Sequence, residues 1–254
     1  MEGHPRYLST ATWVTVEESV KTGNTTKVII PIGSLEQHGP HLPLSTDTTI
    51  ADYIAKLVTK RCADAFLMPP IQFGCSGEHL GFPGTISLQP DTMSNMILDI
   101  SQSLLRSKLT EVYIINGHGG NKATLDAAVT KVKLTLPEMK LYSFTIIDIV
   151  KEKFDEIRKS SRKLVGHADE IETSMMLVIQ PEIVDMSKAI REEPSLPQGL
   201  SFEREDLARI SFGWTAKELT KTGVMGDPKV ANAETGKVLL DFVVDTISNA
   251  INNL

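Results

Sequence analysis

The chain has 254 residues, of which 41% are hydrophobic and 23% charged, a composition typical of a globular protein with a sizeable core. A net charge of −6 leaves no basic field that could bind nucleic acid or an anionic membrane surface. The sequence contains no signal-peptide pattern and no run of about 20 apolar residues. Its two cysteines, Cys62 and Cys75, are expected to be reduced and buried. We therefore expect a cytoplasmic protein that binds neither nucleic acid nor a membrane.

Strands and helices are predicted to alternate along the chain. Hydrophobic runs predict strands at residues 27–32, 65–69, 111–116 and 139–147. Helical spacing predicts helices at 46–61, at 121–134 and from residue 89 onward, and a buried helix at 175–179. Ser45 or Thr46 is expected to cap the first of them. Such alternation indicates parallel strands joined by right-handed crossovers, here in one domain. The charged, proline-broken stretch 191–222 is expected to be a surface excursion or lid.

The segment 30–47, with the sequence IPIGSLEQHGPHLPLSTD, is the first candidate site. Glu36 and His38 follow the first predicted strand and share one side of the chain if it stays extended. Asp47, nine residues past His38, lies at the start of the helical pattern and could fold back onto the same crevice. Open α/β sheets bind ligands beyond the carboxyl ends of their strands. Carboxylates and an imidazole that converge there predict a metal site with oxygen and nitrogen ligands.

The second candidate site is the loop NGHGGN, residues 116–121, which follows the predicted strand 111–116. The glycines around His118 permit close backbone approach and positive φ. A phosphate cradle at a helix start and a purely structural turn are alternative interpretations. We favour metal ligation by His118, because the loop lacks both GxGxxG and GxxxxGK[ST] and the first strand already supplies partners.

The third candidate site is HADEIETS, residues 167–174. Acidic residues at a helix start are usually solvated and stabilise the helix dipole, which is the expectation for Asp169 and Glu170. Glu172 differs, because it lies where the sequence turns apolar and a carboxylate there needs a compensating charge. His167 either caps this helix or acts as an imidazole that titrates near neutrality.

Together with EHLGFPGT at 78–85 and GVMGDP at 223–228, these motifs resemble the creatininase (creatinine amidohydrolase-like) family from about residue 10 to the end. The resemblance implies a three-layer α/β/α sandwich with a mostly parallel sheet. It also implies a hydrolase with two divalent metal ions per chain (Zn, Mn or Fe), assembled as a homohexamer. Apolar surface for such an assembly is expected at 175–179 or 80–83.

By the resemblance, Glu36, Asp47 and His118 bind one metal, and His38 and Asp47 bind the other with a further carboxylate. In creatininase that carboxylate lies two residues after the histidine of the loop, where this chain has Gly120, so Glu172 is expected to replace it. Two cations that share Asp47 would share a water and lower its pKa towards neutrality. His167 would then protonate the leaving group. Glu78 and His79 are expected either to contact substrate or to stabilise a loop, and substrate contacts are also expected from Gly119 and Gly120.

The implied reaction is hydrolysis of a C–N bond, in a cyclic amide or formamide, beside a carbonyl. The resemblance implies that creatininase closes its pocket with tryptophans before the catalytic histidine. Residues 151–166 contain none, and Trp13 and Trp214 lie elsewhere, so creatinine is not the expected small-molecule substrate. The alternatives are a ring-opening hydrolase of an oxidised cyclitol, a keto-inositol, that cleaves an activated C–C bond, and a metal-binding scaffold without turnover.

Overall fold

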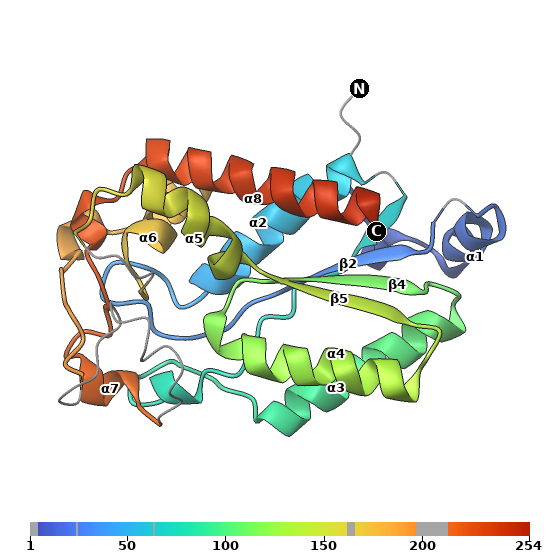
Figure 1. Ribbon diagram of the computed structural model, residues 1–254, viewed down its shortest axis with the longest axis horizontal. Helices are drawn as coiled ribbons and strands as arrows, with labels where there is room; N and C mark the ends of the chain where they lie inside the picture. Colours follow the sequence, from blue (N-terminus) through green and yellow to red (C-terminus); the bar gives the residue numbers. More distant parts are fainter. Residues whose placement is uncertain (1–4, 24, 63, 162–165, 197–212) are drawn as a thin grey trace.

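A parallel five-stranded sheet forms the centre of the computed structural model, which describes residues 5–23, 25–62, 64–161, 166–196 and 213–254. The strand order is β1-β3-β2-β4-β5, and every neighbouring pair runs parallel. Helices cover both faces (Figure 1), so the predicted three-layer α/β/α sandwich is confirmed. The strands are β1 Arg6–Tyr7, β2 Lys27–Ile32, β3 Ala65–Leu67, β4 Glu111–Asn116 and β5 Lys140–Thr145.

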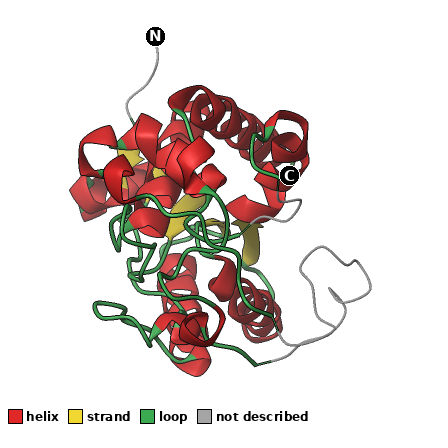
Figure 2. Ribbon diagram, turned by 90° about the vertical axis from the view of Figure 1, so that its left-hand side faces the viewer, coloured by secondary structure: helices red, strands yellow, loops and turns green. Residues whose placement is uncertain are grey.

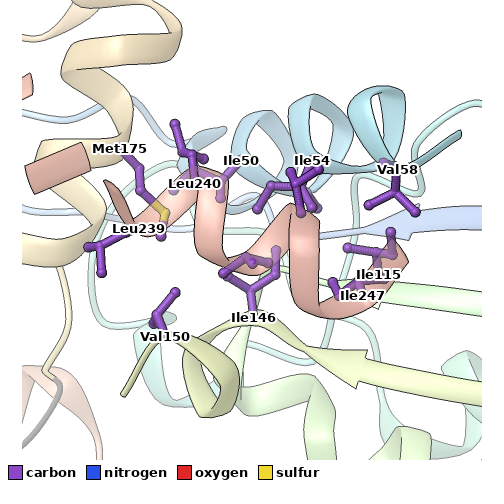
Figure 3. Close-up of a cluster of buried hydrophobic side chains, with 14 of the residues drawn as sticks. Ile50, Ile54, Val58, Ile115, Ile146, Val150, Met175, Leu239, Leu240 and Ile247 are labelled. Atoms are coloured by element: carbon purple, nitrogen blue, oxygen red, sulfur yellow. The ribbon is translucent and has the colours of Figure 1, made fainter. Parts of the chain in front are cut away.

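Two hydrophobic cores lie on the two faces of the sheet, because successive strand residues point to opposite sides. On one face, residues such as Ile30 and Ile114 pack against α1 (Trp13–Lys21), α3 (Pro90–Arg106) and α4 (Lys122–Thr135). On the other, residues such as Ile115 pack against α2 (Thr46–Arg61), α5 (Ile146–Ile157), α6 (Glu170–Ile179) and α8 (Ala233–Asn253). Figure 3 shows this second core, in which Ile54 of α2 and Ile247 of α8 lie near Ile115 of β4.

Several predicted boundaries differ from the structure. The strands β2 and β4 and the helix α2 begin and end where expected, whereas β3 ends at Leu67, two residues early. The strand β5 ends at Thr145, because Ile146 begins α5, whose residues Ile146 and Val150 face the core. Ser45 occupies the N-cap position of α2, but its side chain makes no capping hydrogen bond. The helices α1, α5 and α8 and the short helix α7 (Ala216–Leu219) were not predicted.

The apolar start of segment 175–179 is not available at the protein surface. Met175 and Met176 are 1% and 0% exposed, because α6 packs against both α2 and α8. The expectation that this segment supplies apolar surface is therefore wrong for these residues. Leu80, in the other expected segment, is 58% exposed.

Loops gather at the carboxyl edge of the sheet, the side that faces the viewer in Figure 2. The loops after β2 and β4 and the segment before α6 all lie there, so the three candidate motifs meet. Of the expected lid at 191–222, residues 197–212 lie outside the described residues. Within the described ranges, no helix is long and apolar enough to cross a membrane.

Candidate metal centre

The loop after β2 is pressed against the first turn of α2. A Cβ on Gly33 would lie 2.3 Å from the backbone nitrogen of Thr48, so only glycine permits this approach. Glu36 N donates to Leu44 O at 3.0 Å and closes the loop. The consequence is that Glu36 and His38 from the loop and Asp47 from the helix become neighbours, each at most 1% exposed.

Three overlapping groups of side chains bring ligand atoms within 4.8 Å of one another, as a metal site requires. The structure thus brings together every residue that the sequence analysis expected to bind metal, including Glu172. It also adds His167 to the candidates. The groups are Glu36, Asp47 and His118; His38, Asp47 and Glu172; and Glu36, His38 and His167.

The two histidines beside Asp47 are oriented by backbone carbonyls. His38 Nδ1 lies 3.1 Å from Glu36 O, which can only accept, so Nδ1 donates and Nε2 faces Asp47 Oδ1 at 3.0 Å. His118 Nε2 likewise donates to Cys75 O at 3.0 Å, and its Nδ1 lies 3.1 Å from Asp47 Oδ2. Each imidazole therefore directs the nitrogen that could bind a cation towards Asp47.

Buried carboxylates dominate the charge of the cluster. Burial alone would lower the pKa of His38, but the negative charges of Asp47, Glu172 and Glu36 outweigh it and raise the pKa to about 10. Burial raises the pKa of Glu172, and Asp47 and Asp169 add to this effect. Burial would also raise the pKa of Asp47, but His38 and His118 hold it well below its usual range. The cluster thus attracts positive charge, which either protons or a metal ion can supply.

The unpaired oxygens of the cluster fit a divalent cation. Both carboxylate oxygens of Glu36 and Oδ2 of Asp47 are buried and accept no hydrogen bond from the described residues. A buried carboxylate without donors or a cation costs several kcal/mol, on the order of 3–5 when a charge partner is lost. Carboxylates and imidazoles without thiolate suit Zn²⁺, Mn²⁺ or Fe²⁺ in a catalytic site.

The NGHGGN loop packs closely against the first turn of α2. A Cβ on Gly117 would lie 2.3 Å from Asp47 O, so this glycine permits the loop to approach α2. Asn116 Oδ1 accepts from His118 N at 3.1 Å and so fixes the histidine backbone. None of the three glycines has a positive φ, so that part of the prediction is wrong.

Glu172 is held at the cluster by a strained residue. Ala168 has a φ of 50°, rare for a residue with a side chain, and its N–H donates to Glu172 Oε2 at 2.6 Å. Glu172 Oε2 lies 3.8 Å from His38 Nε2.

Glu170, expected to be solvated, is 0% exposed and accepts hydrogen bonds from the backbone N–H groups of Lys159 and Ser160. Asp169 is the N-cap and is also buried, so the prediction that these two acids are solvated is wrong.

Sequence reasoning did not identify Gln37, which links two histidines of the site. Gln37 Oε1 accepts from Gly39 N at 2.9 Å, which directs Nε2 to donate to His79 Nδ1 at 2.8 Å. His167 Nε2 donates to the backbone oxygen of Gln37 at 2.7 Å. The only signal for Gln37 was its position between Glu36 and His38.

His167 directs an unprotonated nitrogen towards the cluster. Because Nε2 donates to Gln37 O, Nδ1 is the acceptor, and it lies 3.7 Å from Glu36 Oε1. Burial, together with the charges on His38 and His79, holds the pKa of His167 well below its usual range. The helix α6 begins at Glu170 with Asp169 as its N-cap, so His167 does not cap it.

A cavity of about 360 Å³ opens beside these side chains. All four residues expected to contact substrate line it, namely Glu78, His79, Gly119 and Gly120. Burial raises the pKa of Glu78, against the opposing effect of its own backbone amide and His118. The sequence did not indicate three further lining residues, Ile147, Trp214 and Met225.

Curated relatives match this chain along most of its length. A mycofactocin precursor peptide peptidase of Mycobacterium tuberculosis is 34% identical over 230 residues, 86% of this chain and 81% of the relative. A creatinine amidohydrolase of Pseudomonas putida is 27% identical and covers 96% of this chain and 95% of its own. A 3-dehydro-scyllo-inosose hydrolase of Thermotoga maritima is 24% identical and covers 98% of this chain and 83% of its own.

Solved structures of creatininases have the same fold. A mutant creatininase described as the Zn-Zn type superposes with a TM-score of 0.85 at 25% identity, covering 99% of this chain and 98% of its own. A creatininase described as the Mn form gives a TM-score of 0.84 at 25% identity over 98% of both chains. The family model described as creatinine amidohydrolase matches residues 9–251. Hydrolases recur among these relatives, and the chain belongs to the creatininase family of metal-dependent amidohydrolases.

Proposed function

We propose that this protein is a binuclear metal hydrolase that cleaves a C–N bond, in a cyclic amide or formamide, beside a carbonyl. The observation that carries the proposal is the placement of Asp47. Its two carboxylate oxygens face two different histidines, with His38 Nε2 at 3.0 Å and His118 Nδ1 at 3.1 Å. A carboxylate in this position can bridge two cations.

The residues divide into two ligand sets that share Asp47. Glu36 and His118 complete one set, and His38 and Glu172 complete the other. Two divalent ions bound there would polarise the scissile carbonyl and lower the pKa of a water so that it can attack near neutral pH.

His167 is proposed to move the proton. Its Nδ1 is an acceptor beside Glu36, and its low pKa keeps it neutral before reaction. It therefore takes the proton released by the attacking water and afterwards donates it to the leaving nitrogen. This refines the expected role of proton donor, since a neutral imidazole must first accept what it gives.

Creatinine itself is not the proposed substrate. Trp214 is the one tryptophan that lines the cavity among the described residues, and Trp13 is 77% exposed on α1. The relatives' names describe a peptide, creatinine and an oxidised inositol as substrates, so proteins similar to this chain act on different compounds.

The second candidate is a ring-opening hydrolase of a keto-inositol. The observation that favours it is the Thermotoga maritima relative, which aligns over 98% of this chain. The same ligand sets would serve both reactions, because each requires water to attack a carbonyl.

One experiment separates the candidates. Protein purified without chelator is loaded with Zn²⁺ or Mn²⁺, and its metal content is measured by elemental analysis. It is then assayed against cyclic amides, N-formyl compounds and keto-inositols, with metal-stripped protein as control. About two metal equivalents with amide or formamide cleavage support the proposal. Cleavage of keto-inositols alone favours the second candidate, and full activity of the stripped protein contradicts both.

A further inference from the structure

Two backbone groups fix the side-chain amide of Gln37. The N–H of Gly39 donates to Gln37 Oε1 at 2.9 Å, and Gln37 Nε2 donates to the carbonyl oxygen of Gly223 at 3.2 Å. A backbone N–H can only donate and a carbonyl can only accept, so the amide cannot be turned over. Gly223 has a φ of 86°, and a Cβ there would overlap the amide. The GVMGDP motif, residues 223–228, thus closes on Gln37 in a way that only glycine permits.

The fixed amide determines which nitrogen of His79 carries the hydrogen. Gln37 Nε2 has a second hydrogen, which it donates to His79 Nδ1 at 2.8 Å. Since Nδ1 accepts, the imidazole is neutral and its hydrogen lies on Nε2. That nitrogen lies 3.5 Å from Glu36 Oε1, too far for a good hydrogen bond, and His79 lines the cavity. His79 therefore presents an N–H donor beside the cluster.

Gln37 also fixes the neighbouring His167, which is turned in the opposite sense. His167 Nε2 lies 2.7 Å from Gln37 O and 3.0 Å from Gln37 Nε2. A lone pair would repel the carbonyl oxygen at the shorter distance, so Nε2 carries the hydrogen and Nδ1 is bare. The rings of His79 and His167 are 4.3 Å apart between centroids. Side by side, they direct an N–H and a lone pair towards the same oxygen, Glu36 Oε1.

We propose that His79 is a catalytic residue whose Nε2–H donates to the carbonyl oxygen of the substrate, and that Gln37 is the positioning residue that fixes this donor. The inference rests on the proposed function, since it concerns the same reaction. The carbonyl oxygen becomes negatively charged when water attacks, and a missing donor typically costs about 10²–10³-fold in kcat. A neutral imidazole can supply this hydrogen bond. The substrate is then oriented with its oxygen towards His79 and its leaving nitrogen towards His167.

Solid-state ¹⁵N NMR of the zinc-loaded, histidine-labelled protein tests the fixed donor, because it distinguishes protonated from bare ring nitrogens. The His79 signals, identified by their loss in His79→Asn, should show a protonated Nε2 and a bare Nδ1. Gln37→Glu places a carboxylate oxygen opposite Nδ1 and should protonate that nitrogen. The control is Gln72→Glu, the same change at an exposed position outside the cavity, and it should leave the spectrum unchanged.

Acetohydroxamate tests the contact of the donor with a carbonyl oxygen, because it binds zinc and presents such an oxygen beside it. The variants His79→Gln and His79→Asn are a matched pair. The first carries an amide nitrogen near the position of Nε2, and the second carries one near Nδ1. In isothermal titration, His79→Asn should weaken binding roughly tenfold, as the loss of one hydrogen bond predicts. His79→Gln should retain most of the affinity, whereas a purely structural role would favour His79→Asn.

A bare Nε2 on His79 in the unchanged protein, or an unchanged His79 spectrum in Gln37→Glu, would overturn the fixed donor. Equal weakening in the two His79 variants, or no binding of acetohydroxamate by the unchanged protein, would overturn the contact with the carbonyl oxygen. Loss of zinc from His79→Asn would also overturn it, since His79 would then support Glu36. If a variant folds poorly, the unchanged protein gives a second measurement. Acetohydroxamate should shift the Nε2 signal of His79, and an unmoved signal would contradict the proposal.

Neither measurement depends on turnover. A protein that cleaves no amide would therefore contradict the proposed function and leave both tests of His79 and Gln37 intact.

Discussion

Two buried glutamates at the start of α6 differ in what compensates their charge. Glu170 accepts hydrogen bonds from two backbone N–H groups of the segment after α5. Glu172 accepts one from Ala168 and otherwise faces His38 and Asp47. The charge of Glu170 is therefore compensated by backbone hydrogen bonds, whereas the charge of Glu172 requires a cation. This contrast makes them a matched pair for mutation.

Glu172→Gln is expected to lose about one metal equivalent and most of the activity while the protein remains folded. The amide oxygen can still accept from Ala168 N, so the loss concerns charge rather than packing. Glu170→Gln should instead lower the free energy of unfolding by roughly 1–3 kcal/mol and keep the metal. Elemental analysis and thermal melts measure the two effects. Full metal content and rate in Glu172→Gln would show that Glu172 is not a ligand.

His167→Ala is expected to keep its metal and to lose about 10²–10⁴-fold in turnover, the usual effect of a missing proton-transfer group. The variant should recover part of its rate on substrates whose leaving group needs no proton. Pre-steady-state rates on paired good and poor leaving groups measure this. Equal losses on both, with metal intact, would assign His167 to substrate positioning.

At the scale of elements, α6 is held close to α8 by one glycine. A Cβ on Gly236 would lie 1.9 Å from Ser174 O, so the two helices approach to a distance that only glycine permits. Because α6 carries Glu172, the packing of this helix pair also positions a proposed metal ligand.

Gly236→Ala should therefore lower the free energy of unfolding by about 1–3 kcal/mol, the usual cost of overpacking, and weaken metal binding as well. The exposed Asn249→Ala on the same helix is the control and should change neither. Chemical denaturation and metal titration make the comparison. A destabilised variant with unchanged metal affinity would separate the helix packing from the site.

Strands and helices were predicted correctly where a regular hydrophobic pattern had clear ends in the sequence. The strands β2 and β4 are continuous apolar runs, and α2 has apolar residues at helical spacing, so local pattern was sufficient. The pattern failed at β5, where Ile146 continues the apolar run but belongs to α5. Its side chain is apolar in either conformation, and only the packing against α8 decides between them.

The residues of the candidate site divide in the same way, into those that the local sequence predicts and those that depend on distant contacts. Glu36, His38 and Asp47 lie close in sequence, so their meeting could be expected from chain direction alone. Gln37 and Trp214 could not, because their roles depend on contacts with Gly223 and His79, which no local pattern indicates.

At the scale of the whole molecule, metal affinity is expected to rise with pH. The pKa of His38 is raised to about 10, so His38 is protonated at neutral pH in the absence of metal, and the raised pKa of Glu172 lets that carboxyl group take up a proton as the pH falls. A cation must displace these protons, and each displaced proton makes the affinity about tenfold higher per pH unit. Chelator competition between about pH 6 and 8 measures the slope. A flat profile would show that these groups do not bind the metal.

The exposed segment around Leu80 is the expected site of assembly between copies of the chain. The homohexamer implied by resemblance would have about six times the mass of the 27.9 kDa chain. Light scattering at micromolar concentration should give that mass, and Leu80→Glu should lower it if the exposed segment around Leu80 lies in the interface. The exposed Leu134→Glu is the control. A monomer in both variants and in the unchanged chain would contradict the expectation.

The two histidines beside Asp47 are held by the carbonyls of Glu36 and Cys75, which every residue type possesses. No side-chain substitution at position 75 can remove its carbonyl, and one at position 36 would remove the carboxylate but not the group that orients His38. Amino-acid substitutions at these two positions therefore leave in place the carbonyl groups that orient the imidazoles. Cavity residues such as Trp214 and Met225 can vary without turning them. Such an arrangement makes the centre a durable platform on which new substrate preferences could evolve, one point mutation at a time.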